Sequence, residues 1–219
     1  MILAGTSLMT EPGPQAEATQ SWRGRSGESW TARYWQAIGQ AHRRDMLAAL
    51  HAIRRPFGSL VELGCNAGPN LRLIHEAFPG VALAGADVNA EALGYGLRQA
   101  RDEGWGYETM TLDLTRDLSL VIADQRAFDV VLCCYALAYV APANIERVLR
   151  EVKCLARRAV LLLEPTATSR PSEPCAEHEW AHPFPDLVRA VWPDAWSITD
   201  WPVSPPADRL NHLTLVEVG

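Results

Sequence analysis

Three features of this 219-residue sequence predict an α/β protein with a mostly parallel sheet. Short apolar runs alternate with amphipathic segments of helical spacing, as in strand–helix–strand units with right-handed crossovers. The run FDVVLCCYAL is apolar almost throughout, which is typical of a strand covered on both faces. Near the C-terminus the alternation gives way to two strand-like segments in succession, which predict a closing hairpin.

The pattern places seven strands, at residues 60–63, 81–88, 107–114, 128–137, 158–165, 196–203 and 212–218. The helices expected among them are residues 70–78, 90–103, 143–156 and 184–192. Apolar residues at helical spacing between residues 30 and 53 predict one or two further helices, which Pro56 and Gly58 end. A proline-rich loop is expected after Pro165.

The length suits a single domain with a substantial core. Residues 1–28 are rich in Gly, Pro, Ser, Thr and Glu and have no apolar periodicity, so we interpret them as a mobile tail. Residues 29–219 are then the domain, with residues 29–55 as a helical cap at its N-terminal side.

The amino-acid composition indicates which kinds of partner the protein binds and in which cellular compartment it works. A net charge of −6 gives no basic field for a phosphate backbone, so no nucleic-acid partner is expected. Five cysteines, an odd number without a CxxC spacing, favour a reduced, cytoplasmic setting. The longest uncharged stretch, residues 130–145, is shorter than the ~18 apolar residues of a membrane span, and the N-terminus lacks the pattern of a signal peptide.

The turn after the first strand carries the clearest chemical signal. Gly64 and Gly68 allow the main chain to approach a ligand closely or to adopt positive φ. In an open parallel sheet, ligands bind beyond the carboxyl ends of the strands at such a turn. The sequence GCNAGPN fails the G-x-G-x-x-G spacing of a dinucleotide site, and Pro69 removes an amide that would meet a phosphate. A ligand without a phosphate is therefore the better candidate.

The segment VELGCNAG resembles motif I of the class I S-adenosyl-L-methionine-dependent methyltransferases, commonly written E/D-x-G-x-G-x-G. Asn66 replaces the middle glycine, and asparagine tolerates a tight turn. FDVVLCCYALAYV resembles motif IV, AVLLLEP resembles the strand that follows it, and the similarity spans roughly residues 34–219. The resemblance implies a Rossmann-like, doubly wound, seven-stranded sheet with an antiparallel closing strand.

The resemblance also implies the cofactor, S-adenosyl-L-methionine, and roles for individual residues. Glu62 would order the loop under the methionine moiety, Asp87 would bind the ribose hydroxyls, and Asp113 would accept from the adenine amino group beside the Leu114 amide. The complete implied set is Tyr34, Glu62, Gly64, Cys65, Asn66, Gly68, Asp87, Val88, Asp113, Leu114 and Cys134.

These residues have simpler interpretations too. An aspartate at a strand end is often a turn former, and Asp87 followed by Asn89 could cap the next helix. Glu62 is harder to explain in this way, because a carboxylate inside a strand is costly without partners. Asp87 and Asp113 both follow strands beside the same turn, and this shared register favours the site.

Candidates for the acceptor chemistry lie further along the chain. His178 could act as a base, and with His182 it would share one face of a helix if that segment were helical. The neighbouring glutamates raise a metal site as an alternative, but the spacing matches no strong ligand signature, and no metal is predicted. Tyr135 and Tyr139, just past the fourth strand, are expected to face the cofactor or the acceptor, although Tyr139 could be core.

Tyr34 and Trp35 could cover the site, with ordinary packing as the equal alternative. The sequence thus predicts a methyltransferase acting on a nucleophilic O, N or C atom, with a small-molecule metabolite as acceptor. A noncatalytic S-adenosylmethionine-binding regulator or partner subunit of the same fold is the alternative, and a nicotinamide-dependent oxidoreductase is a weaker third.

Overall fold

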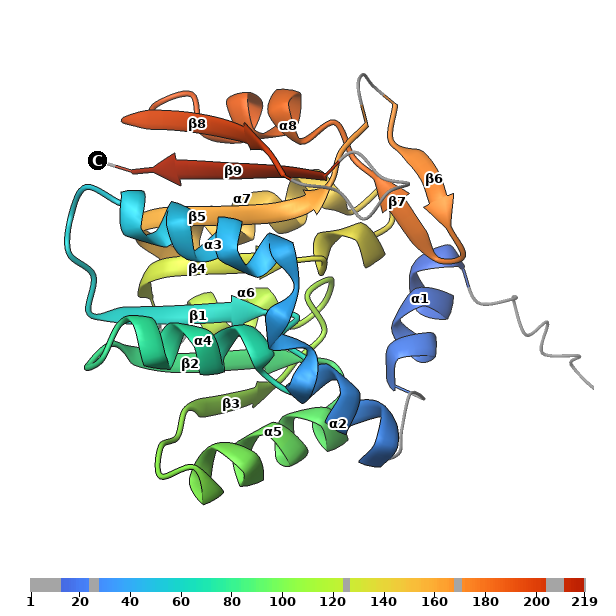
Figure 1. The fold of residues 1–219 in the computed structure, drawn as a ribbon. Helices are drawn as coiled ribbons and strands as arrows, with labels where there is room; N and C mark the ends of the chain where they lie inside the picture. The colour runs from blue at the N-terminus through green and yellow to red at the C-terminus, as the bar shows by residue number, and fades with distance from the viewer. Residues whose placement is uncertain (1–12, 24–27, 124–126, 168–170, 204–210, 219) are drawn as a thin grey trace, which may run out of the picture.

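The computed structural model describes residues 13–23, 28–123, 127–167, 171–203 and 211–218. Its main feature is a seven-stranded sheet of order β3-β2-β1-β4-β5-β9-β8 (Figure 1). The strands are β1 Ser59–Leu63, β2 Ala82–Asp87, β3 Glu108–Thr111, β4 Phe128–Cys134, β5 Ala156–Pro165, β8 Ser197–Pro202 and β9 Asn211–Glu217. Strands β1 to β5 are parallel, and β9 runs antiparallel between β5 and β8. The Rossmann-like, doubly wound sheet with an antiparallel closing strand is confirmed.

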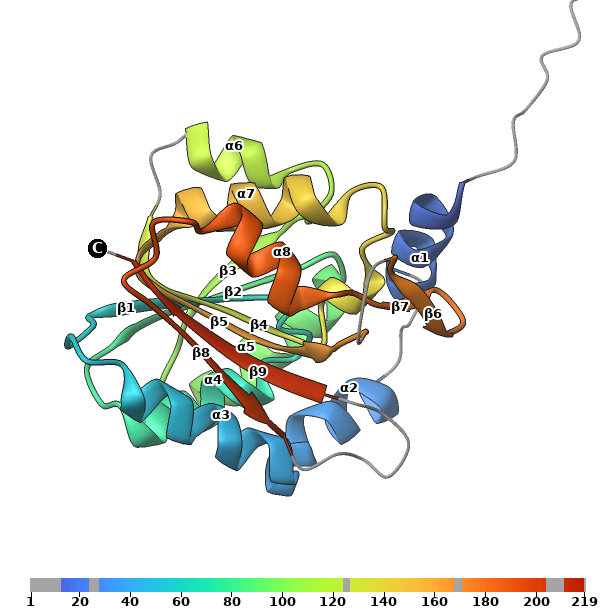
Figure 2. The same ribbon diagram turned by 90° about the horizontal axis from the view of Figure 1, so that it is seen from above.

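Helices cover both faces of this sheet (Figure 2). One face carries α3 Ala41–Ala52, α4 Pro69–Ala77 and α5 Ala90–Asp102, and the other carries α6 Leu118–Ala123, α7 Ile145–Leu155 and α8 Phe184–Val191. Along β4, Val131 packs into the core under α7 and α8, whereas Leu132 packs into the core under α3 and α4. This alternation explains why the strand reads as continuously apolar: each of its side chains meets a helical layer.

The expected helices before the first strand are α2 Glu28–Gln36 and α3, joined by the short 3₁₀ helix η1 Ala37–Gly39. Met46 and Leu50 of α3 are buried in the same core as α4. This helix is therefore a regular part of the helical layer on that face of the sheet.

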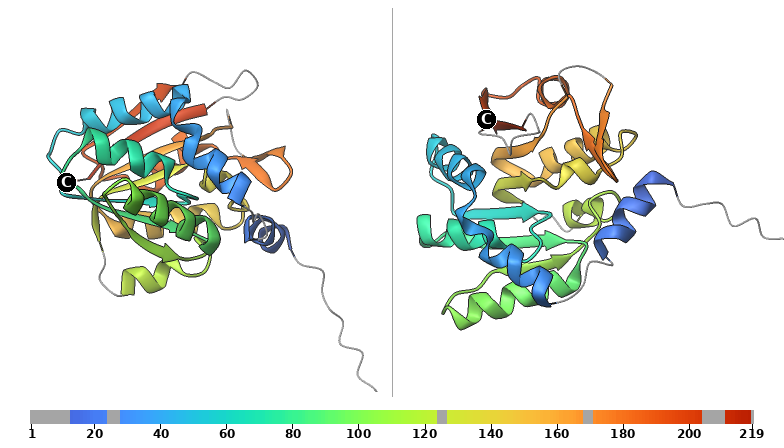
Figure 3. Two further views of the ribbon diagram at one scale, coloured as in Figure 1. Left: turned by 60° about the horizontal axis from the view of Figure 1, so that its bottom comes forward. Right: turned by 45° about the vertical axis from the view of Figure 1, so that its right-hand side comes forward.

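The segment before α2 differs from the expectation. Residues 14–23 lie within the predicted tail, yet they form helix α1 Pro14–Arg23, which crosses the carboxyl ends of the parallel strands (Figures 1 and 3). Pro14 at the first helical position, Glu17 in the first turn and Arg23 in the last turn all suit a helix. Residues 1–12 and 24–27 of the predicted tail lie outside the described residues.

A second difference lies between β5 and α8. The expected proline-rich loop contains a two-stranded hairpin, β6 Glu173–Ala176 and β7 Glu179–Ala181. His178 lies in its turn with a φ of +59°, so the helix that would have aligned His178 with His182 is absent there. Across the described part of the chain, no helix combines the length and the apolar character that crossing a membrane requires.

Candidate active site

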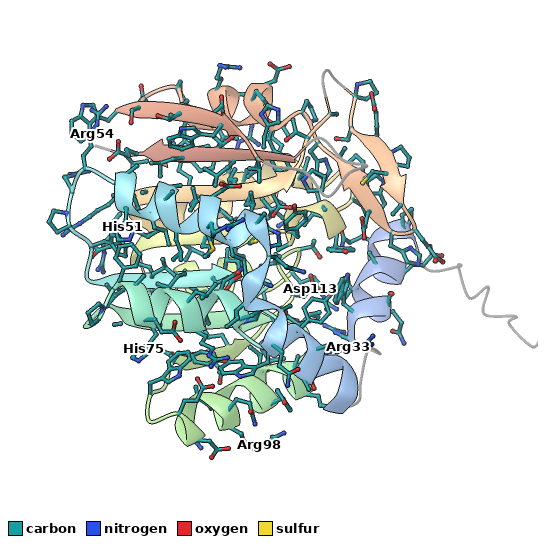
Figure 4. All side chains as sticks on the ribbon, in the orientation of Figure 1. Arg33, His51, Arg54, His75, Arg98 and Asp113 are labelled. Atoms are coloured by element: carbon teal, nitrogen blue, oxygen red, sulfur yellow. The ribbon has the colours of Figure 1, made fainter. Side chains whose placement is uncertain are left out.

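A pocket opens at the carboxyl ends of β1 to β4, and α1 forms its outer side. Asp113, labelled in Figure 4, lies between the strand ends and α1. The cavity volume is about 170 Å³, and the pocket is open to solvent on one side. Eight of the residues that the sequence nominated for the cofactor line this pocket: Tyr34, Gly64, Asn66, Asp87, Val88, Asp113, Leu114 and Cys134.

The main-chain amides of the loop after β1 are all hydrogen-bonded to groups of the protein. The amides of Gly64 and Cys65 donate to the Ala86 carbonyl at 2.7 and 3.0 Å. The Asn66 amide donates to Asp87 Oδ2 at 2.8 Å, and the amides of residues 67 and 68 bond within the loop. Asn66 has a φ of +53°, so the expectation that it occupies a tight turn is confirmed. Because all five amides are used, the loop has none to offer a pyrophosphate.

Gly64 is required by the protein itself. Its φ is +76°, and a Cβ built there would lie 2.3 Å from the Cβ of Ala136, which follows β4. Gly68 has a different role, because it is the left-handed N-cap of α4 and does not line the pocket. Close approach to a ligand or positive φ was expected at both glycines: both have positive φ, and of the two only Gly64 lines the pocket.

Glu62 lies behind the loop in a buried chain of polar groups. Arg43 donates to Asn70 Oδ1, which turns the Asn70 amide nitrogen toward Glu62 Oε1 at 2.6 Å. Burial raises the Glu62 pKa to about 8, against the opposing effects of Asn70 and Arg43. Glu62 Oε2 is buried without a hydrogen-bond partner in the described part of the molecule. Glu62 therefore joins β1 to α4 and α3 and keeps one oxygen available.

Asp87 braces the turn from the end of β2. Its Oδ1 accepts from the Asn89 amide and its Oδ2 from the Asn66 amide, each at 2.8 Å. The helix cap is a different residue, since the Asn89 side chain accepts from the first amides of α5. Burial raises the Asp87 pKa. Asn89, and not Asp87, is therefore the N-cap of α5, and Asp87 lines the pocket.

Asp113 lies two residues past the end of β3 and is 5% exposed. Its Oδ1 accepts from the amide and hydroxyl of Thr115, at 2.9 and 2.7 Å. Its Oδ2 accepts from Thr19 Oγ1 of α1 at 3.3 Å and lies 4.0 Å from an Arg23 nitrogen. One carboxylate therefore joins a strand end to the helix that covers the pocket.

The residues after β4 form the far side of the pocket. Tyr135, one of the two residues nominated for catalysis, lines the pocket with a φ of +55°, and its amide donates to the Leu163 carbonyl at 2.9 Å. A non-glycine residue held in this conformation is often found at functional sites. His42 of α3 packs edge-on against it, and burial lowers the His42 pKa to about 4.

Glu164, which the sequence analysis did not nominate, positions this far side. Its two oxygens accept the amides of Ala136, Leu137 and Ala138 at 3.0, 3.0 and 3.2 Å, at the start of the 3₁₀ helix η2 Leu137–Tyr139. Burial raises its pKa to about 7. The signal in the sequence was an acid closing the otherwise apolar run VLLLE, as unusual as Glu62 in the first strand.

The two candidate histidines, one in the turn of the β6–β7 hairpin and one directly after β7, lie in different parts of the structure. His178 does not reach the pocket: it borders another hollow with Glu17 and Gln20, on the opposite side of α1. His182 is fully buried and bonds Val140 O at 2.9 Å and Ser172 Oγ at 2.7 Å, and burial lowers its pKa to about 4. Within the described residues, no three His, Cys, Asp or Glu side chains gather as a metal site would require.

The aromatic residues divide between the pocket and the core. Tyr139 lines the pocket, donates its hydroxyl to Glu179 Oε1 at 2.6 Å and packs edge-on against Trp22 at 4.7 Å. Tyr34 lines the pocket as well. Trp35 does not: it is 3% exposed and stacks on Trp105, so the packing alternative applies to it.

The α1 face toward the pocket was missed from the sequence. Gln15, Ala18, Thr19 and Trp22 line the pocket and recur at helical spacing. The Gln15 amide donates to Tyr139 O at 3.2 Å and accepts from the Ala141 amide at 2.7 Å, while Trp22 O accepts from Asn89 Nδ2 at 3.2 Å. This face is polar and small except for Trp22, so an apolar pattern could not reveal it.

The site fits the cofactor that the sequence motif implies. Two buried polar atoms at the turn, Glu62 Oε2 and Asn66 Nδ2, have no partner among the described residues. Such groups are costly unless something else completes their hydrogen bonds. The Asp87 and Asp113 carboxylates line the same pocket and retain acceptor capacity for hydroxyl and amino groups. Because the amides of residues 64–68 are already bonded, the site suits a nucleoside without phosphate groups better than a dinucleotide.

This fold has its pocket at the carboxyl ends of the parallel strands, where open α/β sheets bind their ligands. The sequence adds a family: residues 60–158 match the model of a methyltransferase domain. These residues, fewer than half of the chain, carry a methyltransferase domain, and a domain of this kind uses S-adenosyl-L-methionine as its cofactor. No curated protein is a significant match to the whole sequence.

Solved structures support the fold. The chain is similar to magnesium protoporphyrin IX methyltransferase from Synechocystis PCC 6803 with bound S-adenosylmethionine, at 16% identity over 95% of this chain and 98% of that one, with a TM-score of 0.70. An S-adenosylmethionine-dependent methyltransferase from Clostridium acetobutylicum ATCC 824 gives 11% identity over 87% and 97%, with a TM-score of 0.64. The plantazolicin methyltransferase with bound S-adenosylhomocysteine is 12% identical over 94% of this chain and 95% of that one, with a TM-score of 0.63.

Proposed function

We propose that this methyltransferase acts on a nucleophilic O, N or C atom of a small molecule that enters the same pocket as the cofactor. The observation that carries the proposal is the lining of the pocket, which contains two groups of residues of different character. Gly64, Asn66, Asp87 and Asp113, which follow β1 to β3, form what we call the cofactor wall. Trp22, Tyr34, Tyr135 and Tyr139 form what we call the acceptor wall.

The cofactor wall would hold the cofactor through its acidic side chains. Asp87 would accept from the ribose hydroxyls and Asp113 from the adenine amino group, while Glu62 would order the loop under the methionine moiety. When bound, the cofactor supplies an electrophilic methyl group on its sulfonium. The protein then has mainly to align the acceptor and exclude water, and positioning of this kind contributes about 7–11 kcal/mol.

The acceptor wall is what argues against a noncatalytic regulator. A protein that only binds S-adenosylmethionine needs no second side to its pocket, whereas here the cavity continues past Cys134 to Tyr135, Ala136 and Tyr139. Tyr135, one of the two residues nominated for catalysis, lines the pocket and would contact the acceptor. His178 lies across α1 from the pocket, so we assign it no part in the reaction.

Mass spectrometry of the gently purified protein, followed by calorimetry with S-adenosylhomocysteine, tests the proposal. We expect copurified cofactor or product and micromolar affinity, with NAD at least a hundredfold weaker. No heat with S-adenosylhomocysteine at millimolar concentration, or tighter binding of NAD, would contradict it. A turnover screen with small acceptors then separates the enzyme from a regulator, which would bind the cofactor and methylate nothing.

A further inference from the structure

The acceptor wall is aromatic, and its members come from four separate elements. Trp22 lies on α1, Tyr34 on α2, Tyr135 directly after β4, and Tyr139 in η2. Trp22 and Tyr139 meet edge-to-face at 4.7 Å, the geometry that aromatic rings prefer in packed clusters. Rings brought together from such distant points in the chain form a surface suited to a flat, apolar ring.

Acidic groups surround this surface. Asp87 and Asp113 line the pocket, and Glu179 lies directly behind the Tyr139 hydroxyl at 2.6 Å. Glu164 lies behind the backbone of residues 136–138. Within the described part of the chain, the residues that line the pocket include no lysine, arginine or histidine.

Four basic groups near the pocket are hydrogen-bonded, close to an acid, or neutral. Arg43 directs its guanidinium to Asn70, Ala37 O and Gln40, and Arg23 lies 4.0 Å from Asp113. His42, against Tyr135, and His182, behind Val140, each have a pKa lowered to about 4 by burial, so both are neutral near pH 7. A carboxylate or phosphate on the acceptor would thus lie beside acidic side chains, and the described lining of the pocket offers it no basic side chain to pair with.

We propose that the acceptor is a planar aromatic molecule that carries no anionic group, such as a phenol or an aromatic amine. This inference rests on the proposed function, because it assigns the acceptor to the wall beyond the cofactor. It excludes aromatic acids and phosphorylated metabolites as preferred substrates. It also identifies Trp22, a residue of α1, as part of acceptor recognition.

The test is equilibrium binding of four probes to protein saturated with S-adenosylhomocysteine. The probes are 2-naphthol, 6-hydroxy-2-naphthoate, the methyl ester of that acid, and decahydro-2-naphthol. We expect 2-naphthol and the ester to bind within about threefold of each other and the acid at least about tenfold more weakly. The ester is the matched control, since it is larger than the acid but uncharged. The saturated alcohol should bind about tenfold more weakly than 2-naphthol, because it cannot stack.

A pair of tryptophan variants tests the wall itself. Trp22→Leu should weaken 2-naphthol binding about tenfold while affinity for S-adenosylhomocysteine stays within about threefold. Trp196→Leu, at an exposed tryptophan that does not line the pocket, should change neither. Acid and ester binding equally, saturated and aromatic alcohols binding equally, or no probe binding at all would each overturn the inference. Loss of S-adenosylhomocysteine binding by the wild-type protein would instead overturn the proposed function.

Discussion

The cofactor wall and the acceptor wall of one pocket are built in different ways. The cofactor wall is held mainly by main-chain amides at the ends of the neighbouring strands β1 to β3, such as the Asn66 amide on Asp87 and the Thr115 amide on Asp113. The acceptor wall is held by side chains far apart in sequence: Gln15 binds residues 139 and 141, and Glu164 binds residues 136–138. The same edge of a sheet can thus combine a locally encoded turn with a surface assembled from distant segments.

The most damaging single change should be Gly64→Ala, because the two walls touch at this point. The new methyl would overlap the Ala136 side chain and require a positive φ, so we expect a loss of about 3 kcal/mol or more in the free energy of unfolding, measured by urea denaturation. Adding Ala136→Gly should restore at least about 1 kcal/mol through relief of that overlap.

The rescued double variant also tests how closely the cofactor approaches. If the backbone at residue 64 must pass against the cofactor, the double variant will fold and still fail to bind S-adenosylhomocysteine. Near-normal affinity in that protein would mean that Gly64 serves only the fit between β1 and the segment after β4.

Asp87→Ala tests the cofactor wall alone. The loss of charge-assisted hydrogen bonds to the ribose, about 1.5–3 kcal/mol each, should weaken S-adenosylhomocysteine binding by one to three orders of magnitude in calorimetry. Asp102→Ala, at an exposed acid that ends α5, is the control and should leave affinity unchanged. Wild-type affinity in Asp87→Ala would reduce Asp87 to a brace for the Asn66 and Asn89 amides.

Glu164→Gln is the corresponding test of the acceptor wall. A glutamine has one acceptor oxygen, so at least one of the amides of residues 136–138 would face an NH₂ group and lose its partner, which costs about 1–3 kcal/mol of unfolding free energy. Glu146→Gln, on the exposed surface of α7, should cost less than about 0.5 kcal/mol. Equal melting temperatures for the two variants would show that the turn after β4 holds itself.

Glu62, behind the cofactor wall, should make the stability of the protein depend on pH. Its pKa is raised from 4.5 to about 8 in the folded protein, so the native state holds a proton that the unfolded chain releases. The stability contributed by Glu62 is therefore complete below pH 4.5 and is lost as pH rises toward about 8. Relative to Glu62→Gln, which cannot ionise, wild type should lose a few °C of melting temperature between pH 5 and 8. A constant difference across that range would mean that Glu62 is ionised throughout.

The smallest expected effect concerns the docking of α1. Gln15→Ala removes the two hydrogen bonds that tie this helix to residues 139 and 141, worth about 1 kcal/mol in total, and should speed amide exchange in α1 several-fold. Gln20→Ala, on the opposite face of α1, should not. Similar exchange in both variants would show that Trp22 and Thr19 suffice to hold the helix.

The sequence by itself determined the sheet, its helical layers and the cofactor wall. Those features follow from local rules: apolar periodicity marks the strands and helices, and the turn at residues 64–68 needs particular residues at fixed spacing. Glu62, Asp87 and Asp113 were nominated through the resemblance to a methyltransferase motif. Two observations favoured them: a carboxylate inside a strand is costly without partners, and Asp87 and Asp113 follow strands beside the same turn.

Only the tertiary structure decided what faces the pocket from the other side. Gln15, Thr19 and Glu164 act through contacts with residues distant in the chain, and no local pattern distinguishes such side chains from solvated ones. The same limit explains His178, a candidate base that lies across α1 from the pocket, because its segment forms a hairpin turn and not a helix that would align it with His182. The conformation of the main chain depends largely on neighbouring residues in the sequence, whereas contacts between distant side chains form only in the complete fold.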